Sequence, residues 1–330
     1  MIEVSIYIWL GFIIFIIAML ALDLGVFQKK KHWIPVKEAL ALSAFWIALA
    51  MVFNIIIFMW QGPKPAMEFL TGYLIEESLS VDNLFVFLII FSYFGVPKDY
   101  WHEVLFYGIL GALVMRGIFI GVGIAIISQF HWVLYIFGAI LIYTAIKVAG
   151  QQGEKMDPGK NKVITFFKKH MNLTDDCTQG NFFEKRSGKR IATPLVLTLI
   201  SIELTDVVFA MDSVPAIFGV TLDQFIVYTS NVFAILGLRA LFFALAGCMN
   251  KIHYLNYGLG VILGFIGIKI LLPAVGYVVP GFHYEIPTEY ALGIVATVLL
   301  VAVLASYLRT IRNGSCSEPP GDLIQPTGKR

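Results

Sequence analysis

The chain has few charged residues for its length. Asp, Glu, Lys and Arg make up 14% of its 330 residues, while hydrophobic residues make up 58%. A soluble domain carries about 25% charged residues, so this composition excludes an ordinary soluble protein. The apolar runs have the length of membrane-spanning helices and not of barrel strands. The sequence therefore predicts an all-α polytopic membrane protein.

Cysteine and familiar enzyme motifs are also scarce. The three cysteines, Cys177, Cys248 and Cys316, lie far apart and are odd in number, so they predict neither a disulfide framework nor a Cys-x-x-Cys metal site. The chain has no Gly-x-x-x-x-Gly-Lys-Ser/Thr loop, which argues against an ATPase. It has no His-Glu-x-x-His or Gly-x-Gly-Asp, which argues against an intramembrane hydrolase. We therefore expect neither an enzyme nor a bound cofactor.

Nine hydrophobic runs are long enough to cross a bilayer. They cover Ile6–Phe27, Ala39–Trp60, Phe69–Phe94, Val104–Ile127, Trp132–Ala149, Pro194–Val220, Phe225–Met249, Tyr257–Val279 and Tyr290–Leu308. Lys and Arg gather after the first, fifth and ninth runs, and nine spans place these three segments on one side. By the positive-inside rule that side is the cytoplasm. We expect a cell inner-membrane protein with its N-terminus outside and its C-terminus in the cytoplasm.

The basic connection at Gln151–Arg190 needs no nucleic-acid partner, because topology and anionic lipid headgroups account for its charge. A short helix is expected near Val163–His170. The resulting division of the chain has six parts. They are residues 1–66 with two spans and a basic loop, 67–150 with a first three-helix repeat, 151–191 as a cytoplasmic loop, 192–279 with a second three-helix repeat, 280–310 with the last span, and 311–330 as a disordered cytoplasmic tail.

The two three-span units repeat each other in sequence. Leu113-Val-Met-Arg116 resembles Leu236-Gly-Leu-Arg239, and Tyr135–Lys147 resembles Tyr257–Lys269. The spacing agrees as well, with 31 residues from Arg to Lys in the first unit and 30 in the second. Because each unit has three spans, the second must be inverted relative to the first. Inverted repeats with a site at mid-membrane are a transporter architecture.

Two of the spans carry acids near their middle, where each ionised carboxylate costs about 3 kcal/mol unless it is paired, hydrated or metal-bound. On an ideal helix the polar residues of each span fall on one face. These polar stripes are Glu76, Ser80 and Asn83 on the third span, and Glu203, Asp206 and Ser213 on the sixth.

Two further acids, Asp82 and Asp212, do not share those faces if both helices stay regular. Pro215 removes one helical hydrogen bond and clashes with the carbonyl of Met211. We therefore expect a local break at Met211–Pro215 that frees carbonyls and turns Asp212 toward the same cavity as the other acids.

Carboxylate, amide, hydroxyl and freed carbonyl oxygens suit hard divalent cations such as manganese, magnesium or calcium. No His or Cys lies at the centre of a span, which argues against zinc and copper(I). Glu77 is either a further ligand or a neighbour on the helix, and Asp23 is either an entry-path group or an interfacial acid. Four basic residues are expected either to neutralise the acids or to extend toward the interface. They are Arg116, Arg239, Lys147 and Lys269.

Three segments, Tyr73–Phe85, Ile202–Phe218 and Thr229–Ala240, resemble the signature segments of the TerC family of integral membrane proteins. The resemblance extends from Ile6 to Leu308 and is closest to the Alx branch. It implies manganese(II) export. It also implies a functional set of acids at Glu76, Asp82, Glu203, Asp206 and Asp212, to which we add Asn83, with Ser80, Ser213 and Asn231 as further candidates.

These observations together lead us to expect an exporter of a hard divalent cation, with manganese(II) as its substrate and protons as the exchanged ion. The expected partners are the metal ion and the bilayer, and no nucleic acid. Two alternatives stay open. One is an assembly protein that docks partners on Gln151–Arg190 and has a structural acid cluster. The other is a membrane protein associated with tellurite resistance that does not itself transport metal.

Overall fold

The computed structural model describes residues 5–27, 35–150, 181–186, 189–246, 255–278 and 286–312. Within these ranges the chain forms nine long helices, one short 3-10 helix and one two-stranded hairpin. The long helices are α1 (Ile6–Phe27), α2 (Val36–Gln61), α3 (Pro63–Tyr93), α4 (Trp101–Gln129), α5 (Val133–Gly150), α7 (Pro194–Phe218), α8 (Gln224–Ala246), α9 (Leu255–Val278) and α10 (Thr288–Arg312). Each predicted span corresponds to one helix, and the expected all-α class is confirmed.

Six of the described helical segments are long and apolar enough to cross a membrane by length and composition. They lie in α2, α4, α7, α8, α9 and α10, while α1 and α5 hold shorter apolar stretches at Ile6–Leu22 and Val133–Val148. The remaining long helix, α3, has 31 residues, and its apolar run is interrupted by Glu76, Glu77 and Asp82. The chain is therefore a multi-pass membrane protein, with nine long helices among the residues that the structure describes.

A single glycine sets where α3 begins. Gly62 separates α2 from α3 and has a φ of 94°, a conformation that other residues rarely adopt. Pro63 follows at the first helical position, where its fixed φ suits the helix and its missing N–H costs nothing. Consequently α3 starts six residues before the predicted span at Phe69.

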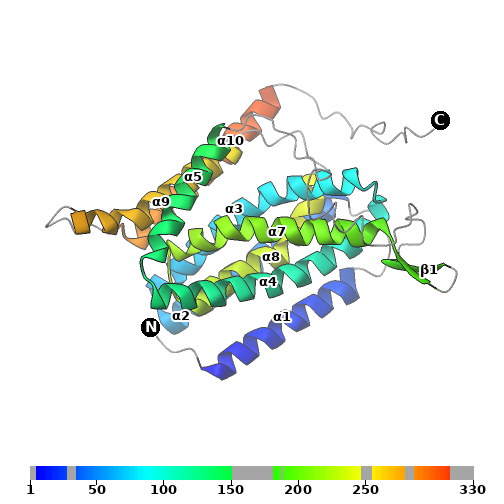
Figure 1. Cartoon of the computed structure of the whole chain (residues 1–330), viewed down its shortest axis with the longest axis horizontal. Coiled ribbons are helices and arrows are strands. Elements are labelled where there is room, and N and C mark those ends of the chain that lie inside the picture. The colour runs from blue at the N-terminus through cyan, green and yellow to red at the C-terminus, as the bar shows by residue number, and fades with distance from the viewer. Residues whose placement is uncertain are drawn as a thin grey trace.

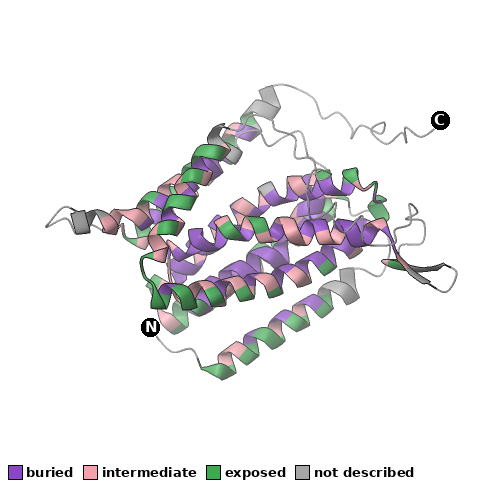
Figure 2. Ribbon diagram, viewed as in Figure 1, coloured by how far each residue is buried: buried purple, intermediate pink, exposed green. Residues whose placement is uncertain are grey.

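Four helices form the centre of the molecule. α3 packs against α7 and α8, and α4 also packs against α7 and α8; Figure 1 shows the four running side by side. α8 is the most enclosed, since α2, α3 and α4 all contact it and nearly its whole length is buried (Figure 2). α5, α9 and α10 make a second group beside α3 and α7. Exposed apolar side chains on α1, α2, α5 and α10 are the surface expected to face lipid.

A short hairpin precedes α7, which the sequence did not predict. β1 (Phe183–Arg186) pairs antiparallel with β2 (Lys189–Ala192), and Phe183 lies opposite Ala192. The strands are four residues long and mostly charged, so they lack the apolar alternation that marks a strand. The helix expected near Val163–His170 lies outside the described residues.

The two three-helix units run in opposite directions. Gly72, near the start of α3, lies beside Ile217 at the end of α7, so these first helices are antiparallel. Gly138, early in α5, lies beside Ile270 in the second half of α9, so the third helices are antiparallel too. The contacts between the units also correspond. The first helix of one unit packs on the second helix of the other, since α3 packs on α8 and α7 packs on α4. These contacts support the inverted repeat, which stays a prediction.

We predict that the α3–α4 and α7–α8 connections lie on opposite sides of the membrane. Asp99 and Gln224 are exposed in these connections and suit single cysteines in a background lacking Cys177, Cys248 and Cys316. A membrane-impermeant maleimide applied to intact cells should label Gln224→Cys and not Asp99→Cys. Both should react after permeabilisation. Labelling of both residues from the same side would rule out the inverted repeat.

Candidate functional site

Arg116 lies at the middle of α4 and is 1% exposed. Its guanidinium makes two parallel hydrogen bonds to Asp206 of α7, from Nε to Oδ2 at 3.3 Å and from Nη2 to Oδ1 at 3.0 Å. It also forms an ion pair with Glu76 of α3. Nη1 donates to Asn231 Oδ1 of α8 at 2.7 Å and lies 3.4 Å from Ser213 Oγ. One side chain thus joins all four central helices.

This pairing satisfies charges that would otherwise be costly in the interior. A buried ion is stable only where partners of opposite charge and hydrogen bonds replace water. The planar guanidinium suits a carboxylate that accepts two bonds, which a lysine ammonium could not match in geometry. Arg116 and Asp206 are therefore fixed relative to each other, and Arg116 has the geometry of a charge partner for the acids.

Several buried polar atoms near Arg116 lack a hydrogen-bond partner among the described residues. Glu76 is fully buried, and its Oε2 atom has no hydrogen-bond partner among the described residues. Within the same part of the chain, Ser80 Oγ and Asn231 Nδ2 are also buried without a partner. Asn83 is buried one turn beyond Ser80. Glu77, beside Glu76 in sequence, is half-buried, and its Oε2 has no described hydrogen-bond partner either. The α3 stripe predicted from sequence thus faces the interior and could bind a further ligand.

Glu203 lies one turn before Asp206 on α7 and is half-buried. Its carboxylate rests against the backbone of α4 at Gly111, where a Cβ atom would overlap it. It interacts electrostatically with Asp206, and no described residue donates a hydrogen bond to it. The predicted face of Glu203, Asp206 and Ser213 therefore does point toward α4.

Asp212 does not join this cluster, and the expected helix break is wrong. α7 runs unbroken from Pro194 to Phe218 with Pro215 inside it. Pro215 takes the donor from one carbonyl, that of Met211, and the helical bonds on either side of it keep α7 continuous. Asp212 stays on the face that a regular helix gives it and accepts a hydrogen bond from Thr144 Oγ1 of α5 at 3.0 Å. Sequence reasoning did not single out Thr144.

The other predicted charged residues are placed apart from Arg116. Arg239 is buried in α8, with Nη1 3.3 Å from His102 Nδ1. Lys147 is exposed near the end of α5, and Lys269 is half-buried in α9. The side chains of Asp23 and Asp82 lie outside the described part of the structure.

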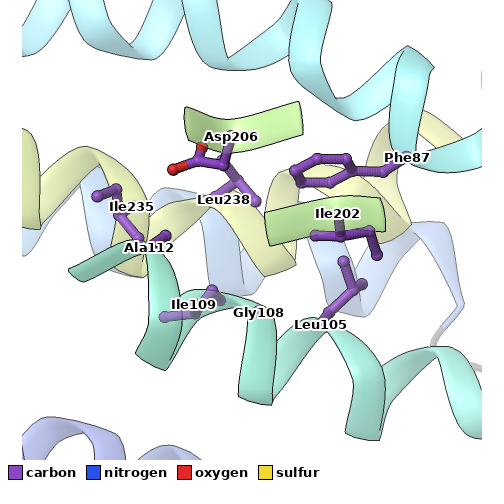
Figure 3. Close-up of a pocket in the computed structure, with 9 residues that line it drawn as sticks. All are labelled: Phe87, Leu105, Gly108, Ile109, Ala112, Ile202, Asp206, Ile235 and Leu238. Carbon is purple, nitrogen blue, oxygen red and sulfur yellow. The ribbon is translucent and has the colours of Figure 1, made fainter. Parts of the chain in front are cut away.

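A small cavity borders Asp206 between the four central helices (Figure 3). Asp206 is the one polar side chain among the residues that line it. The apolar lining consists of Phe87, Leu105, Gly108, Ile109, Ala112, Ile202, Ile235 and Leu238. The carboxylate thus lies at the edge of an apolar space, where a low local dielectric would strengthen its interaction with a cation.

Among the residues that the structure describes, no three His, Cys, Asp or Glu side chains converge as a metal-binding group. The ion pairs explain this, because Arg116 lies between Glu76 and Asp206. The described arrangement is therefore an acid cluster neutralised in part by a built-in cation. A metal could bind the same carboxylates where Arg116 releases them.

The sequence has clear relatives. It is 45% identical to an uncharacterized membrane protein, STKORF319, of Myxococcus xanthus over 92% of both chains. It is 45% identical to the putative membrane-bound redox modulator Alx of Escherichia coli K12, over 90% of this chain and 92% of the relative. An uncharacterized membrane protein of Rickettsia bellii is 42% identical over 91% of this chain and 97% of the relative.

No solved structure matches the chain significantly. The sequence pattern of the family described as integral membrane protein TerC family matches residues 61–314, which include α3 to α10 and the whole Arg116 cluster. The chain therefore belongs to the TerC family of integral membrane proteins.

Proposed function

We propose that this protein exports a hard divalent cation, with manganese(II) as the leading candidate, from the cytoplasm in exchange for protons. The observation that carries the proposal is the buried acid cluster around Arg116, at the centre of four packed helices. Glu76 and Asp206 are both less than a tenth exposed, and Glu76 still has an unpartnered oxygen. Acids at this depth are characteristic of ion pathways.

The charge of the cluster fits a divalent cation. With all carboxylates ionised, Glu76, Glu203 and Asp206 together with Arg116 leave two formal negative charges. A cation held by carboxylate oxygens, Ser80 and Asn231 would have the oxygen ligands that manganese, magnesium and calcium accept. The same charge would repel tellurium oxyanions, which makes them poor substrates for this site.

Arg116 gives the exporter a resting state. In the described arrangement its guanidinium binds both carboxylate oxygens of Asp206 and pairs with Glu76. A metal ion that binds the same oxygens has to displace it, so cation binding and the α4–α7 contact are coupled. When the metal leaves, Arg116 can return and keep the empty site from remaining as an unpaired buried charge.

The sequence and the relatives support a proposal for the orientation and the class of the protein. We propose that the metal loads from the cytoplasm, because Lys and Arg gather after the first and fifth apolar runs of the sequence and the positive-inside rule predicts a cytoplasmic side for such segments. We also propose that the protein is not an enzyme, since the relatives named above are described as membrane proteins or a redox modulator.

We predict that Asp206→Asn abolishes manganese tolerance in a manganese-sensitive strain that expresses the protein. Asparagine keeps the shape of aspartate but removes the charge that a divalent ion needs. Asp223→Asn is the matched control, because Asp223 Oδ1 caps α8 by accepting from the N–H groups of Phe225 and Ile226, which asparagine can also do. Equal tolerance for Asp206→Asn and the parent would exclude Asp206 from transport.

The effect of Asp206→Asn on folding has to be distinguished from its effect on transport. Removing one partner of a buried ion pair costs about 3–5 kcal/mol, because the other charge is left uncompensated. The triple variant Arg116→Met, Asp206→Asn and Glu76→Gln removes the guanidinium together with both of its carboxylate partners, so it should recover membrane insertion and thermal stability. It should still fail to restore tolerance. Recovery of tolerance by the triple variant would assign these three charges to structure alone, as in the assembly-protein alternative.

We predict that manganese affinity of the purified protein rises with pH. Carboxylates bind a metal in their ionised form, so binding must expel any protons they carry, and higher pH lowers that cost. Calorimetry at several pH values, in buffers of different ionisation heat, reports the protons released per metal bound. Affinity that is flat in pH together with no proton release would contradict exchange with protons and indicate an uncoupled route.

A further inference from the structure

The α4–α7 interface is built from small residues on the α4 side. A Cβ atom on Gly108 would lie 3.3 Å from Ile202 Cγ2, and Ala112 is buried one turn later. At Gly111 the neighbour is the Glu203 carboxylate, and a Cβ atom there would overlap its carboxyl carbon and both of its oxygens. The absence of a side chain at Gly111 therefore makes the space in which this carboxylate lies.

This placement is unusual for an acid in a helix interface. The carboxylate of Glu203 interacts with Asp206, a group of the same charge, and no described residue donates a hydrogen bond to it. Space at Gly111 thus holds a carboxylate beside the Arg116–Asp206 pair without a cation or donor of its own. Within the described part of the chain this carboxylate has no structural partner, and it suits a cation that arrives from outside the protein.

We propose that Gly111 is a positioning residue for the cation site, because it alone leaves room for the Glu203 carboxylate beside Asp206. The inference rests on the proposed function and adds a residue that does not itself touch the metal. Alanine at position 111 would push the carboxylate out of this space, since the flexible end of Glu203 is what must move. The site would then lose one of its acids although every acid is still present in the sequence.

The test is manganese binding to the purified full-length protein, measured by calorimetry. Gly111→Ala should weaken binding about tenfold to a hundredfold, the range found when a group that orients a ligand is lost. Gly121→Ala is the matched control, because it lies on the same helix and a Cβ atom there has nothing within 4 Å. Both changes raise helix propensity equally, so a difference between them reports on the Glu203 space.

A double-mutant cycle separates positioning from general damage. Glu203→Gln should weaken binding by a similar factor, and Gly111→Ala should add no further loss in the Glu203→Gln background, because both changes remove the same interaction. Glu203→Asp combined with Gly111→Ala should bind better than Gly111→Ala alone, since the shorter acid clears the added methyl group. If Gly111→Ala does not fold, the inference requires Glu203→Asp to restore folding.

Three results would overturn the inference. Normal binding by Gly111→Ala with weakened binding by Glu203→Gln would show that Gly111 does not position Glu203, and it would leave the proposed function intact. Losses that multiply in the double variant would show that Gly111 acts elsewhere in the fold. Absence of manganese binding by the parent protein would overturn both this inference and the proposed function.

Discussion

The ion pair of Arg116 with Asp206 and Glu76 is the interaction on which the central architecture depends. It joins α3, α4 and α7 directly and reaches α8 through Asn231. In hydrocarbon no water can replace any of these partners, so each helix must keep its polar residue aimed at the same point. Around this point the contacts are apolar, and Gly108 and Ala112 let α4 lie close to α7. A rigid apolar frame thus holds a charged centre with more acid than base.

That excess of acid is the feature on which the proposed transport rests. A structural ion pair needs one carboxylate for one guanidinium, and replacing such a pair with apolar residues often does not destabilise a protein. Here Arg116 has two carboxylate partners, Glu203 lies next to them without a donor among the described residues, and Glu76 Oε2 is unused. Arg116 can therefore be viewed as a tethered cation that occupies the site when no mobile cation does. In the proposed mechanism, exchange between the two requires α4 and α7 to move relative to each other, and the two predicted three-helix repeats are the bodies that would do so.

The sequence predicted the parts of this structure that depend on local pattern. Apolar run length located all nine helices, and helical periodicity placed Glu76 and Ser80 on one buried face and Asp206 and Ser213 on another. Contacts between helices could not be predicted from the sequence pattern. Nothing in the pattern shows that Arg116 binds both acid-bearing helices, that Asp212 pairs with Thr144, or that Gly111 makes space for Glu203. Pro215 was misleading because a proline takes the donor from one carbonyl, and here the helical bonds on either side of it keep α7 continuous. The hairpin before α7 was missed because its strands are short and charged.

The central claim is that the acid cluster conducts a divalent cation out of the cytoplasm. The most direct measurement is metal uptake into inside-out vesicles containing the purified protein, screened across manganese, magnesium and calcium with and without an inward-acidic pH gradient. The account predicts uptake that is greatest for a hard divalent cation, is accelerated by the gradient, and is absent from protein-free vesicles. Uptake equal to that of protein-free vesicles for every cation, with the protein shown to be folded and correctly inserted, would contradict it.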